Sequence, residues 1–517
     1  MSQDRPASLL DRHAEIGTLT VMAQKSVMRL MLPAGVVIIL AAMYLALTDQ
    51  PGIKALLLIA GGAFAALAIW NSRAMGLPLM PMMAIQSLII YGMPIVAAHE
   101  NIKGYPAEFV LRAGAEVLAF NLAMALSWWV GMNFMTPSRP VSFALREFNR
   151  SGTAGLCRLG FGMLGAATLF EVLQGLNLVS ALYQVMPSGA DSIIETLVAV
   201  ASACGLFLIS MVIGGKDASP TQRYAFVGLL IVNTMIAADG FLLAGPAANL
   251  ITVAIGLFWG GGRIPWRYLT LALLTLSFLN LGKTTMRNRY WGNEDKLAVN
   301  ITIDRLPSIF GEWSEASYEA ILENNAEPVR GLANNGDPKA RNQTLLDRID
   351  NLQNLLFVID AIDTEHVKLL HGATYSLIPP LLVPRVFWPD KPRSHEGQIL
   401  LNVHFGRQDL DSTQITYIAW GLLPEAYGNF GALAGSLTLG VFLGVFFAWV
   451  ENFTVRKLVV SMEGFLSLCL LLSLMNSFEM VASVLVTSTF QSMVVVVAAS
   501  YPFVRRTVTK RPASDAE

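Results

Sequence analysis

The stretch "KALLLIAGGAFAALAIWNS" (residues 54–72) already indicates the class of protein. After Lys54 it contains no charged side chain, and it is as long as the roughly 20 apolar residues that a helix needs to cross a bilayer. Runs of the same kind recur along the chain, at about 30–48, 54–72, 78–98, 114–134, 158–178, 193–214, 224–242, 245–262, 266–284, 431–450, 459–477 and 482–502. The sequence therefore predicts an all-α polytopic integral membrane protein with about 12 transmembrane helices.

Composition supports the same class. Of the 517 residues, 54% are hydrophobic and 14% are charged, whereas about 25% are charged in soluble proteins. Cys157, Cys204 and Cys469 lie in or beside apolar stretches, too far apart for a metal motif, so we interpret them as packing residues. The mixed polar residues 1–28 precede an apolar run long enough to span, so we expect a retained helix rather than a cleaved signal peptide.

The spans over 224–242 and 245–262 leave an alternative open. They share a very short connection around Asp239 and Gly245, so the pair could equally be one broken helix and a re-entrant piece. The charges of the loops test the number of membrane helices. One missed helix before residue 284 would move every later basic loop to the outer side of the membrane.

The charges of the loops predict the orientation of the chain. If the N-terminus is cytoplasmic, the inward loops and the tail hold a series of basic residues: Arg73, Arg139, Arg146, Arg150, Arg158, Lys216, Arg223, Arg263, Arg267, Arg456, Lys457, Arg505, Arg506, Lys510 and Arg511. The short outward loops near 180–192, 239–245 and 477–482 contain no Lys or Arg. This positive-inside bias favours two cytoplasmic termini.

These spans divide the chain into five parts. We expect a cytoplasmic N-terminal segment (1–28), about nine membrane helices (29–284), a large periplasmic loop (285–430), about three membrane helices (431–503) and a cytoplasmic tail (504–517). The loop is too long for a plain connector and should contain a helix within 345–370. The apolar run at 375–383, broken by Pro379 and Pro380, is too short to span and predicts a re-entrant or interfacial segment.

The stretch "PRVFWPDKP" (residues 384–392) is a stiff, charged and aromatic bracket within that loop. Its prolines favour extended backbone, and Phe387 and Trp388 suit the boundary between membrane and water. The bracket would hold three cations at headgroup depth, where they are suited to a diphosphate: Arg385, Lys391 and Arg393. The alternative is an interfacial anchor whose Arg and Trp side chains only snorkel.

The stretch "YIAWGLLPEAYGNFG" (residues 417–431) supplies a candidate general base. Its polar groups are Glu425, Tyr427 and Asn429. Glu425 could act as a base or orient an arginine, or it could cap the N-terminus of the following helix. His404 or His395 is a second candidate base, and the four histidines of the loop lack the close spacing of a zinc site.

Two arginines in "KTTMRNRYWGNED" (residues 283–295) stand against the positive-inside trend. Arg287 and Arg289 could complete a cationic rim around the same site, and ordinary headgroup contact is the alternative. Asp409 and Asp411 have the spacing of a metal-binding pair, but that spacing is common by chance, so we predict no metal site. The chain has neither a Walker loop nor a dinucleotide-binding fingerprint.

The order of these motifs resembles the oligosaccharide repeat-unit polymerases of bacterial surface polysaccharides, the Wzy-type O-antigen polymerases. Their pattern begins with a glycine–tyrosine segment, here Gly372 and Tyr375, and continues with a proline–arginine–aromatic–tryptophan–proline–x–lysine–proline run, here 384–392. A glutamate–x–tyrosine–x–asparagine–phenylalanine–glycine element follows before a late span, here 425–431. The likeness is specific over about residues 355–440 and elsewhere concerns topology alone.

The resemblance implies a function and an architecture. Such a polymerase transfers a glycan from undecaprenyl diphosphate to the non-reducing end of another lipid-linked repeat unit, on the periplasmic side of the bacterial inner membrane. The resemblance also implies a membrane glycosyltransferase (GT-C-like) architecture, shared with the O-antigen ligases, without nucleotide sugar, metal or other cofactor. The implied partners are undecaprenyl-diphosphate-linked oligosaccharide, the lipid bilayer, a flippase and a chain-length regulator, and we expect no nucleic acid.

The implied chemistry assigns roles to the candidate residues. Preorganised cations would stabilise the departing diphosphate, and a base would deprotonate the acceptor hydroxyl. We predict Arg385 at the leaving group, with support from Arg287, Arg289, Lys391 and Arg393. Glu425 is the favoured base and His404 the second choice, although the family motif assigns no base. The candidates for contact with the glycan are Tyr375, Trp388, Tyr427 and Asn429.

Two other functions stay open. An O-antigen ligase would transfer the finished chain to lipid A-core, but "WPDKP" and "EAYGNFG" favour the polymerase. A transporter or flippase of lipid-linked glycan would show internal repeats and polar sites at the bilayer midplane. Here no repeat is visible, and the polar groups concentrate in one loop.

Overall fold

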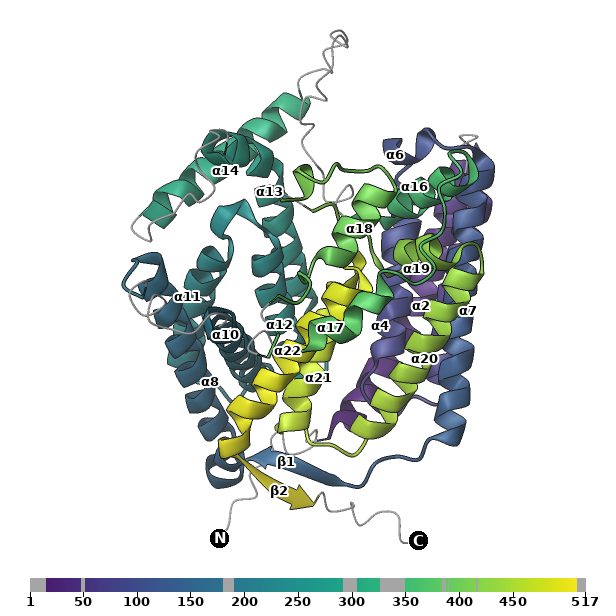
Figure 1. The fold of residues 1–517 in the computed structure, drawn as a ribbon. Coiled ribbons are helices and arrows are strands. Elements are labelled where there is room, and N and C mark those ends of the chain that lie inside the picture. Colours follow the sequence, from purple (N-terminus) through teal and green to yellow (C-terminus); the bar gives the residue numbers. More distant parts are fainter. Residues whose placement is uncertain are drawn as a thin grey trace. The chain divides into compact units, whose positions relative to one another are not determined.

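The computed structural model describes residues 15–47, 52–179, 190–291, 305–325, 349–383, 387–388, 390–414 and 417–508. The chain divides into two compact units, which are described separately below. The first unit comprises Met1–Arg12 and Glu147–Arg348, and the second comprises His13–Arg146 and Ile349–Glu517. In Figure 1 the purple and yellow helices belong to the second unit.

Ten helices in the described residues are long and apolar enough to cross a membrane, which confirms the all-α, multi-pass membrane class. They are Ile16–Leu47, Ile53–Asn71, Leu79–Val96, Ala107–Phe134, Ser151–Gly175, Ile193–Gly214, Ala244–Gly261, Trp266–Tyr290, Ala434–Thr454 and Ala482–Phe503. The other two predicted spans are also helical. The first, α11 (Pro220–Ala237), begins with a polar turn, and the second, α21 (Met462–Met475), has 14 residues and reaches only about 21 Å.

The second unit begins with α2 (Ile16–Leu47), so the predicted start of the first helix near residue 30 is too late. Residues 16–29 have only Lys25 and Arg29 as charged side chains, and they continue the same helix beyond the apolar run. The elements that follow are α3 (Ile53–Asn71), α4 (Leu79–Ser87), the π-helix η1 (Leu88–Gly92), α5 (Met93–Val96), α6 (Glu100–Lys103) and α7 (Ala107–Phe134).

The chain returns to the second unit after residue 348. Its elements there are α16 (Asn351–Asp363), η4 (Tyr375–Leu377), α17 (Ile378–Leu382), α18 (Glu396–His404), η5 (Ser412–Gln414), α19 (Leu422–Phe430), α20 (Ala434–Thr454), α21, η6 (Ser477–Glu479), α22 (Ala482–Ser500) and η7 (Tyr501–Phe503). The predicted helix within 345–370 is α16, and the predicted interfacial run is the short helical pair of η4 and α17.

A small two-stranded sheet departs from the all-α prediction. The strand β1 (Val141–Leu145) pairs antiparallel with β2 (Val504–Val508), and Phe143 lies opposite Arg506. Residues 504–517 were expected as a plain tail. Pairing between strands so distant in sequence depends on tertiary contacts, which local sequence pattern does not show.

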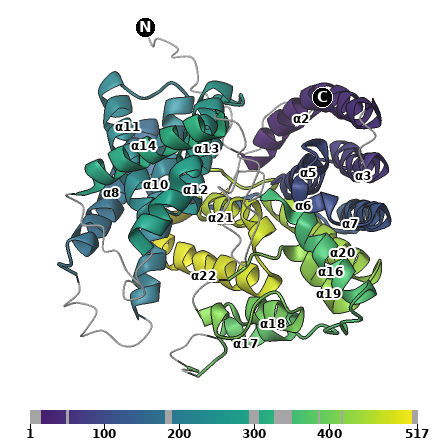
Figure 2. The ribbon, with the colours of Figure 1, turned by 90° about the horizontal axis from the view of Figure 1, so that it is seen from above.

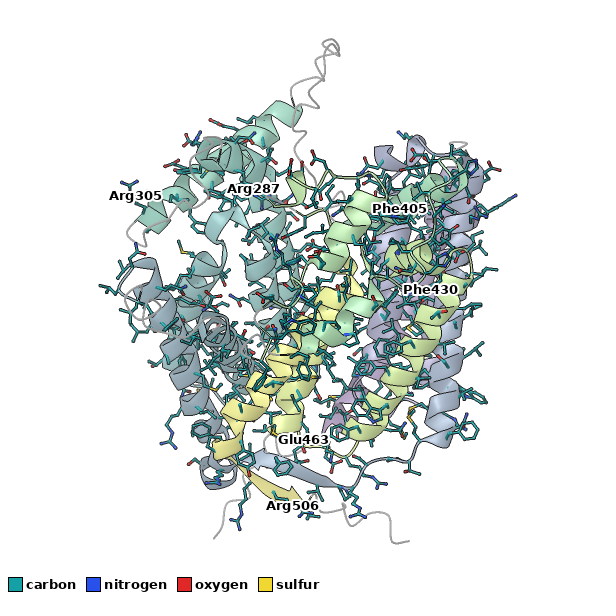
Figure 3. All side chains as sticks on the ribbon, in the orientation of Figure 1. Arg287, Arg305, Phe405, Phe430, Glu463 and Arg506 are labelled. Carbon is teal, nitrogen blue, oxygen red and sulfur yellow. The ribbon has the colours of Figure 1, made fainter. Side chains whose placement is uncertain are left out.

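The loops of the second unit gather at two ends. One end joins the start of α2, the segment after α7, the connection between α20 and α21, and the segment after α22. The other end holds α16 and the turn after α21, where Nδ2 of Asn351 donates to the carbonyl of Phe478 (2.6 Å). Figure 3 labels Glu463 and Arg506 near the first end and Phe405 towards the second. These two groups are the predicted inward and outward loops, whereas their placement in cytoplasm and periplasm stays a prediction.

Close helix packing in the second unit depends on glycine. The helix α7 packs against both α3 and α20, and Figure 2 shows it between them. A Cβ atom on Gly114 would lie 2.7 Å from Cα of Ala55, and one on Gly440 would lie 2.6 Å from the carbonyl oxygen of Phe120. Small residues thus bring the backbones of neighbouring membrane helices together.

Gly444→Ala is expected to lower the free energy of unfolding by about 1–3 kcal/mol. The added Cβ would collide with the carbonyl oxygen of Met124 and the hydroxyl of Ser127 on α7, and a backbone carbonyl cannot rotate away. Thermal unfolding of the detergent-solubilised protein measures the effect. Gly35→Ala is the matched control, because a Cβ there meets nothing within 4 Å. Equal unfolding midpoints for the two variants would contradict this packing.

The first unit consists of α8 (Arg146–Gly175), α10 (Ala190–Gly214), α11, η2 (Asp239–Phe241), α12 (Ala244–Gly261), α13 (Trp266–Trp291) and α14 (Leu306–Asn325). The helices α11 and α12 are separate and flank η2. Nδ2 of Asn233 donates to Oε2 of Glu171 (3.2 Å), and Oδ1 of Asn233 accepts from Oγ of Ser202 (3.2 Å). Nδ2 of Asn249 donates to the same Oδ1 (2.7 Å), so one asparagine links four helices.

Candidate active site

The two segments that carry the resemblance lie against each other in the second unit. The amide of Leu370 donates to the carbonyl of Gly428 (3.1 Å), and the amide of His371 donates to the carbonyl of Asn429 (2.9 Å). The amide of Gly372 donates to Oδ1 of Asn429 (3.0 Å), across 57 positions of sequence. Residues 370–372 are therefore fixed along α19. We call this contact the motif junction.

Asn429 is the centre of the motif junction. Its side chain is fully buried, and Nδ2 donates to Oγ1 of Thr374 (2.9 Å) and to the carbonyl of Glu425 (2.8 Å). With the bond from Gly372, both ends of the amide are occupied by the protein itself. This corrects the sequence prediction that Asn429 contacts the glycan, and we assign it to the support of the site.

Aromatic stacking and two glycines complete the motif junction. Tyr375 stacks on Phe430, with 5.6 Å between the ring centroids and 14° between the planes. Gly372 and Gly431 have φ angles of +87° and +79°, a region that favours glycine. The glycine–tyrosine segment and the asparagine–phenylalanine–glycine segment thus form one structural unit.

Glu425 is completely buried in α19. Its Oε2 accepts a hydrogen bond from the amide of Ala482 (2.6 Å), the first residue of α22. Its Oε1 is buried and has no hydrogen-bond partner among the described residues. Burial raises the pKa of Glu425 to about 7, and the Thr374 side chain and the Ala482 amide offset part of the rise. A carboxyl that titrates near neutrality is suited to act as a general base.

Glu425 does cap the N-terminus of a helix, as the alternative interpretation expected, but of a different helix. The carboxyl caps α22 and not the next helix along the chain, α20. The N-terminus of α20 is instead capped by Glu116 of α7, whose Oε1 accepts from the amide of Leu433 (2.9 Å). Because only one oxygen of Glu425 serves the cap, the other is available for chemistry.

Several buried polar atoms of the second unit lack a hydrogen-bond partner in the part of the chain that the structure describes: Oη of Tyr375, Nδ2 of Asn402, Oγ of Ser483 and Oγ1 of Thr487. Ser483 follows Ala482, Thr487 lies one turn further along α22, and the carboxylate of Glu425 contributes to a raised pKa of Tyr375, after burial. Buried polar groups are normally paired, so this concentration indicates a place for a polar ligand.

The sequence missed three residues of this polar group. Asn402, Ser483 and Thr487 belong to α18 and α22, and each resembles an ordinary polar residue of a helix. One signal was available, because Ser483 and Thr487 are four residues apart and share a face of α22. The hydroxyl of Tyr375, which the sequence did single out, is buried, and its contact with the glycan stays a prediction.

Part of the bracket at 384–392 is described. Arg385 lies outside the described residues, so its role stays a prediction. Phe387 and Trp388 are 80% and 43% exposed, as residues at a membrane boundary would be. Arg393, directly after the bracket, is exposed as well. The described outer edge of the bracket is thus aromatic and basic.

Lys391 is buried and faces its own chain. Its Nζ donates to the carbonyls of Leu381 (2.8 Å) and Val383 (2.6 Å), at the C-terminal end of α17. A cation is favourable at that end of a helix. This corrects the prediction of direct contact with a diphosphate, and we assign Lys391 to holding the bracket against α17.

His404 lies at the end of α18 and remains the second candidate base. Its Nε2 lies 2.7 Å from the carbonyl oxygen of Lys368. A carbonyl can only accept, so Nε2 carries a proton, and Nδ1 is the acceptor in the neutral ring. His395 has a different environment, stacked on Tyr417 at 4.5 Å between centroids, with Nδ1 2.9 Å from Oε1 of Gln398.

Tyr427 is buried, with 1% of its area accessible. Burial raises the pKa of its hydroxyl, and the nearby Arg112 offsets part of that rise. Arg112 also forms an ion pair with Asp363. As with Asn429, the prediction of glycan contact is corrected, and Tyr427 joins α19 to α7.

Arg287 and Arg289 both belong to α13 of the first unit. Nη1 of Arg289 pairs with Oε2 of Glu312 (3.2 Å), which also accepts from the hydroxyl of Tyr290 (2.9 Å). Arg287 is half-buried. Their place on a cationic rim with Arg385 stays a prediction.

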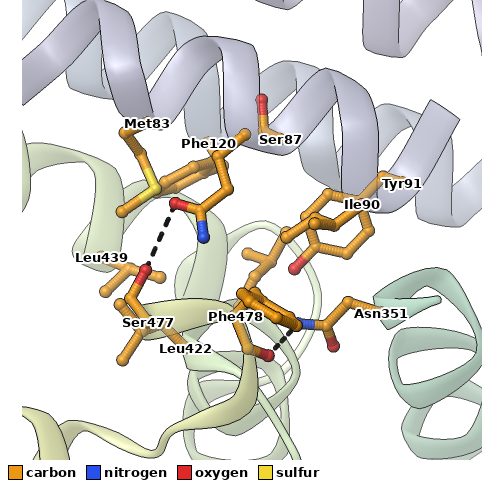
Figure 4. A pocket seen from close by; sticks show the side chains of 12 residues that line it. Met83, Ser87, Ile90, Tyr91, Phe120, Asn351, Leu422, Leu439, Ser477 and Phe478 are labelled. Carbon is orange, nitrogen blue, oxygen red and sulfur yellow. Dashed lines mark hydrogen bonds between the residues drawn. The ribbon is translucent and has the colours of Figure 1, made fainter. Parts of the chain in front are cut away.

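A small pocket lies beside the π-helix η1, as Figure 4 shows. Its lining includes Tyr91, Phe120 and Leu422, and the hydrogen bond from Asn351 to Phe478 borders it. The space amounts to about 20 Å³, enough for about one water molecule. We therefore do not assign this pocket to a sugar.

The candidate site thus combines a buried carboxyl with hydroxyl and amide groups that have no partner among the described residues, and the bracket of the same unit has an aromatic and basic exposed edge. The carboxyl can move a proton, and the edge can meet lipid headgroups. Comparison of the chain with protein-family models, curated proteins and solved structures gives no match.

Proposed function

We propose that the protein polymerises oligosaccharide repeat units carried on undecaprenyl diphosphate, as a glycosyltransferase of the bacterial inner membrane that acts on the periplasmic side. The motif junction carries this proposal. It brings together two of the segments that resemble the Wzy-type polymerases, and one of the two carries the buried carboxyl of Glu425. A chance likeness would not require these segments to meet.

Glu425 is the general base in this proposal. Its carboxylate takes the proton from a hydroxyl of the acceptor sugar, and the hydroxyl oxygen attacks the anomeric carbon of the donor. The bond between that carbon and the diphosphate oxygen breaks, and undecaprenyl diphosphate leaves with the electron pair. The hydroxyl groups of Tyr375, Ser483 and Thr487, which have no partner within the described ranges, are suited to orient sugar hydroxyls.

Cations at the bracket stabilise the leaving group. Negative charge develops on the diphosphate as it departs, and fixed cations at that position lower the barrier. Arg385 and Arg393 have this role. Lys391 holds the bracket against α17 through its hydrogen bonds to two backbone carbonyls. The diphosphate ester is already activated, so the reaction needs no nucleotide sugar.

The wider setting follows from the same proposal. The fold would be of the GT-C-like membrane type, with both termini in the cytoplasm. The grouping of the predicted outward loops of the second unit at one end supports a site that opens to one side. A flippase would deliver the repeat units, and a chain-length regulator would set the length of the product.

The glycan profile of a strain that lacks the gene tests the proposed function. A polymerase-null strain should carry single repeat units on lipid A-core, and the intact gene should restore the ladder of long chains. Loss of all attached glycan, with lipid-linked polymer still made, would identify a ligase. Retention of lipid-linked units on the cytoplasmic face would identify a flippase.

A further inference from the structure

Arg407 is a half-buried cation that the proposed chemistry does not yet use. It follows α18, and its guanidinium carbon lies 5.1 Å from the ring centroid of Phe357 and 5.8 Å from that of Trp420. Its Nη1 is buried, without a hydrogen-bond partner among the described residues. Burial lowers the pKa of the guanidinium, yet arginine stays protonated in proteins. Arg407 is thus a charged group whose Nη1 can still donate a hydrogen bond to a ligand.

The surroundings of Arg407 offer aromatic faces in place of a carboxylate. Arg112, at the same end of the unit, forms an ion pair with Asp363, whereas no carboxylate pairs with Arg407 within the described ranges. The hydroxyl of Tyr105 is the titratable group that acts on it. An unpaired buried donor costs about 1–3 kcal/mol, and more when it is charged. An anion that accepts from Nη1 would remove that cost.

The loop that carries Arg407 is held in place by its own hydrogen bonds. The amides of Arg407 and Gln408 both donate to the carbonyl of Asn402, at 2.8 and 3.2 Å. Oε1 of Gln408 accepts from the amide of Ile418 (3.3 Å), and Nε1 of Trp420 donates to Oδ1 of Asn402 (2.7 Å). The same asparagine therefore fixes both the cation and one of its aromatic partners. The backbone at Arg407 and the ring of Trp420 are thus positioned before any ligand arrives.

We propose that Arg407, held between Phe357 and Trp420, binds a phosphate group of a diphosphate through Nη1. A planar guanidinium matches phosphate oxygens, and stacking on two rings restricts its rotation. Anion binding follows from the geometry alone, whereas its assignment to the lipid-linked donor rests on the proposed function. Trp420 leads directly into α19, so the bound diphosphate would lie next to the helix that carries Glu425 in its first turn.

Ligand-dependent thermal stability of the full-length protein in detergent tests this site. The probes are inorganic diphosphate, farnesyl diphosphate and phosphatidylglycerol. Both diphosphates should raise the unfolding midpoint of the wild type. Arg407→Gln should weaken their apparent affinity by about tenfold or more, since a hydrogen bond to a charged group is lost. An unchanged affinity would overturn the proposal.

Two further variants keep the test decisive. Arg407→Lys retains the charge but loses the fork and the stacking, so its affinity should fall between those of Arg407→Gln and the wild type. Arg73→Gln is the matched control, because Arg73 also lies over a tryptophan, Trp129 (5.8 Å), but is exposed. It should bind diphosphate as the wild type does. Wild-type affinity for Arg407→Lys would show that the fork and the stacking play no part and would overturn the site.

The three probes separate the sources of phosphate and the two proposals. A response to phosphatidylglycerol alone that depends on Arg407 would make this a phospholipid contact and overturn the diphosphate assignment. A ligase-type glycan profile, together with diphosphate binding that depends on Arg407, would overturn the polymerase but leave the anion site. A polymerase-type profile, together with diphosphate binding that does not depend on Arg407, would support the polymerase and overturn the anion site.

Discussion

Glu425→Gln is expected to lower the rate of polymerisation by about 10²–10⁴-fold, the range typical of losing a general base. Glutamine preserves the size of the side chain, and its amide oxygen can still accept from the amide of Ala482, so the cap on α22 remains. The variant loses only the ability to take a proton. A large fall in rate without a loss of folded protein would therefore report on chemistry.

The rate is measured with purified protein and lipid-linked repeat units. Glu365→Gln is the matched control, because Glu365 is an exposed glutamate of the same loop. The wild-type rate should rise as the pH is raised through about 7, where Glu425 loses its proton, and Glu425→Gln should lack this dependence. A variant as fast as the wild type would exclude Glu425 as the base and favour His404.

The ionisation of Glu425 raises the rate of polymerisation but lowers the stability of the folded protein. Burial raises its pKa from an ordinary value near 4.5 to about 7, so the folded state holds the proton more tightly than the unfolded state does. This contribution is fully present below pH 4.5 and is lost as the pH rises through 7. At pH 8, Glu425→Gln should therefore be more stable than the wild type by up to about 3 kcal/mol. The difference in unfolding midpoint should shrink towards pH 5.

Asn429→Ala is expected to lower the free energy of unfolding by about 2–4 kcal/mol and to abolish most polymerisation. The change removes the hydrogen bonds to Gly372, Thr374 and the carbonyl of Glu425, and it leaves a buried amide without its acceptor. Only the two backbone hydrogen bonds of Leu370 and His371 and the stacking of Tyr375 on Phe430 would then hold residues 370–375 on α19. Both the stability and the alignment of Tyr375 with Glu425 depend on this one side chain.

Denaturation of the variant in detergent measures the loss, with Asn133→Ala as the matched control. Asn133 is exposed, and its Nδ2 donates to the carbonyl of Trp129 within α7 (2.9 Å), so its removal should change stability little. If Asn429→Ala unfolds at the same temperature as the control variant, the motif junction does not hold the site together. Its activity should be measured at a temperature where the variant remains folded.

Apolar length and composition predict the membrane helices closely, because the bilayer imposes both. The run at 54–72 is α3 (Ile53–Asn71), and each of the twelve predicted spans contains a helix. Boundaries are predicted less well where a helix continues beyond its apolar run. The helix α2 begins at Ile16 because nothing in residues 16–29 ends it, and the short α21 still joins the two ends of its unit.

The candidate site is predictable only as far as residue type and motif order reach. Glu425 and Tyr375 lie together, as the motifs suggested, but the sequence does not show which way a side chain points. Lys391 turns towards two carbonyls of its own chain. Arg407 gave no signal at all, because its aromatic partners come from separate segments, at Phe357 and before α19.

Reconstitution of the purified protein into liposomes with undecaprenyl-diphosphate-linked repeat units, and no other protein, gives the most direct answer. We predict a ladder of lipid-linked polymers, release of undecaprenyl diphosphate for each bond formed, and neither product with Glu425→Gln. Folded wild-type protein that moves the units across the bilayer, or binds them, without ever joining two of them would contradict the proposal that this protein is the polymerase.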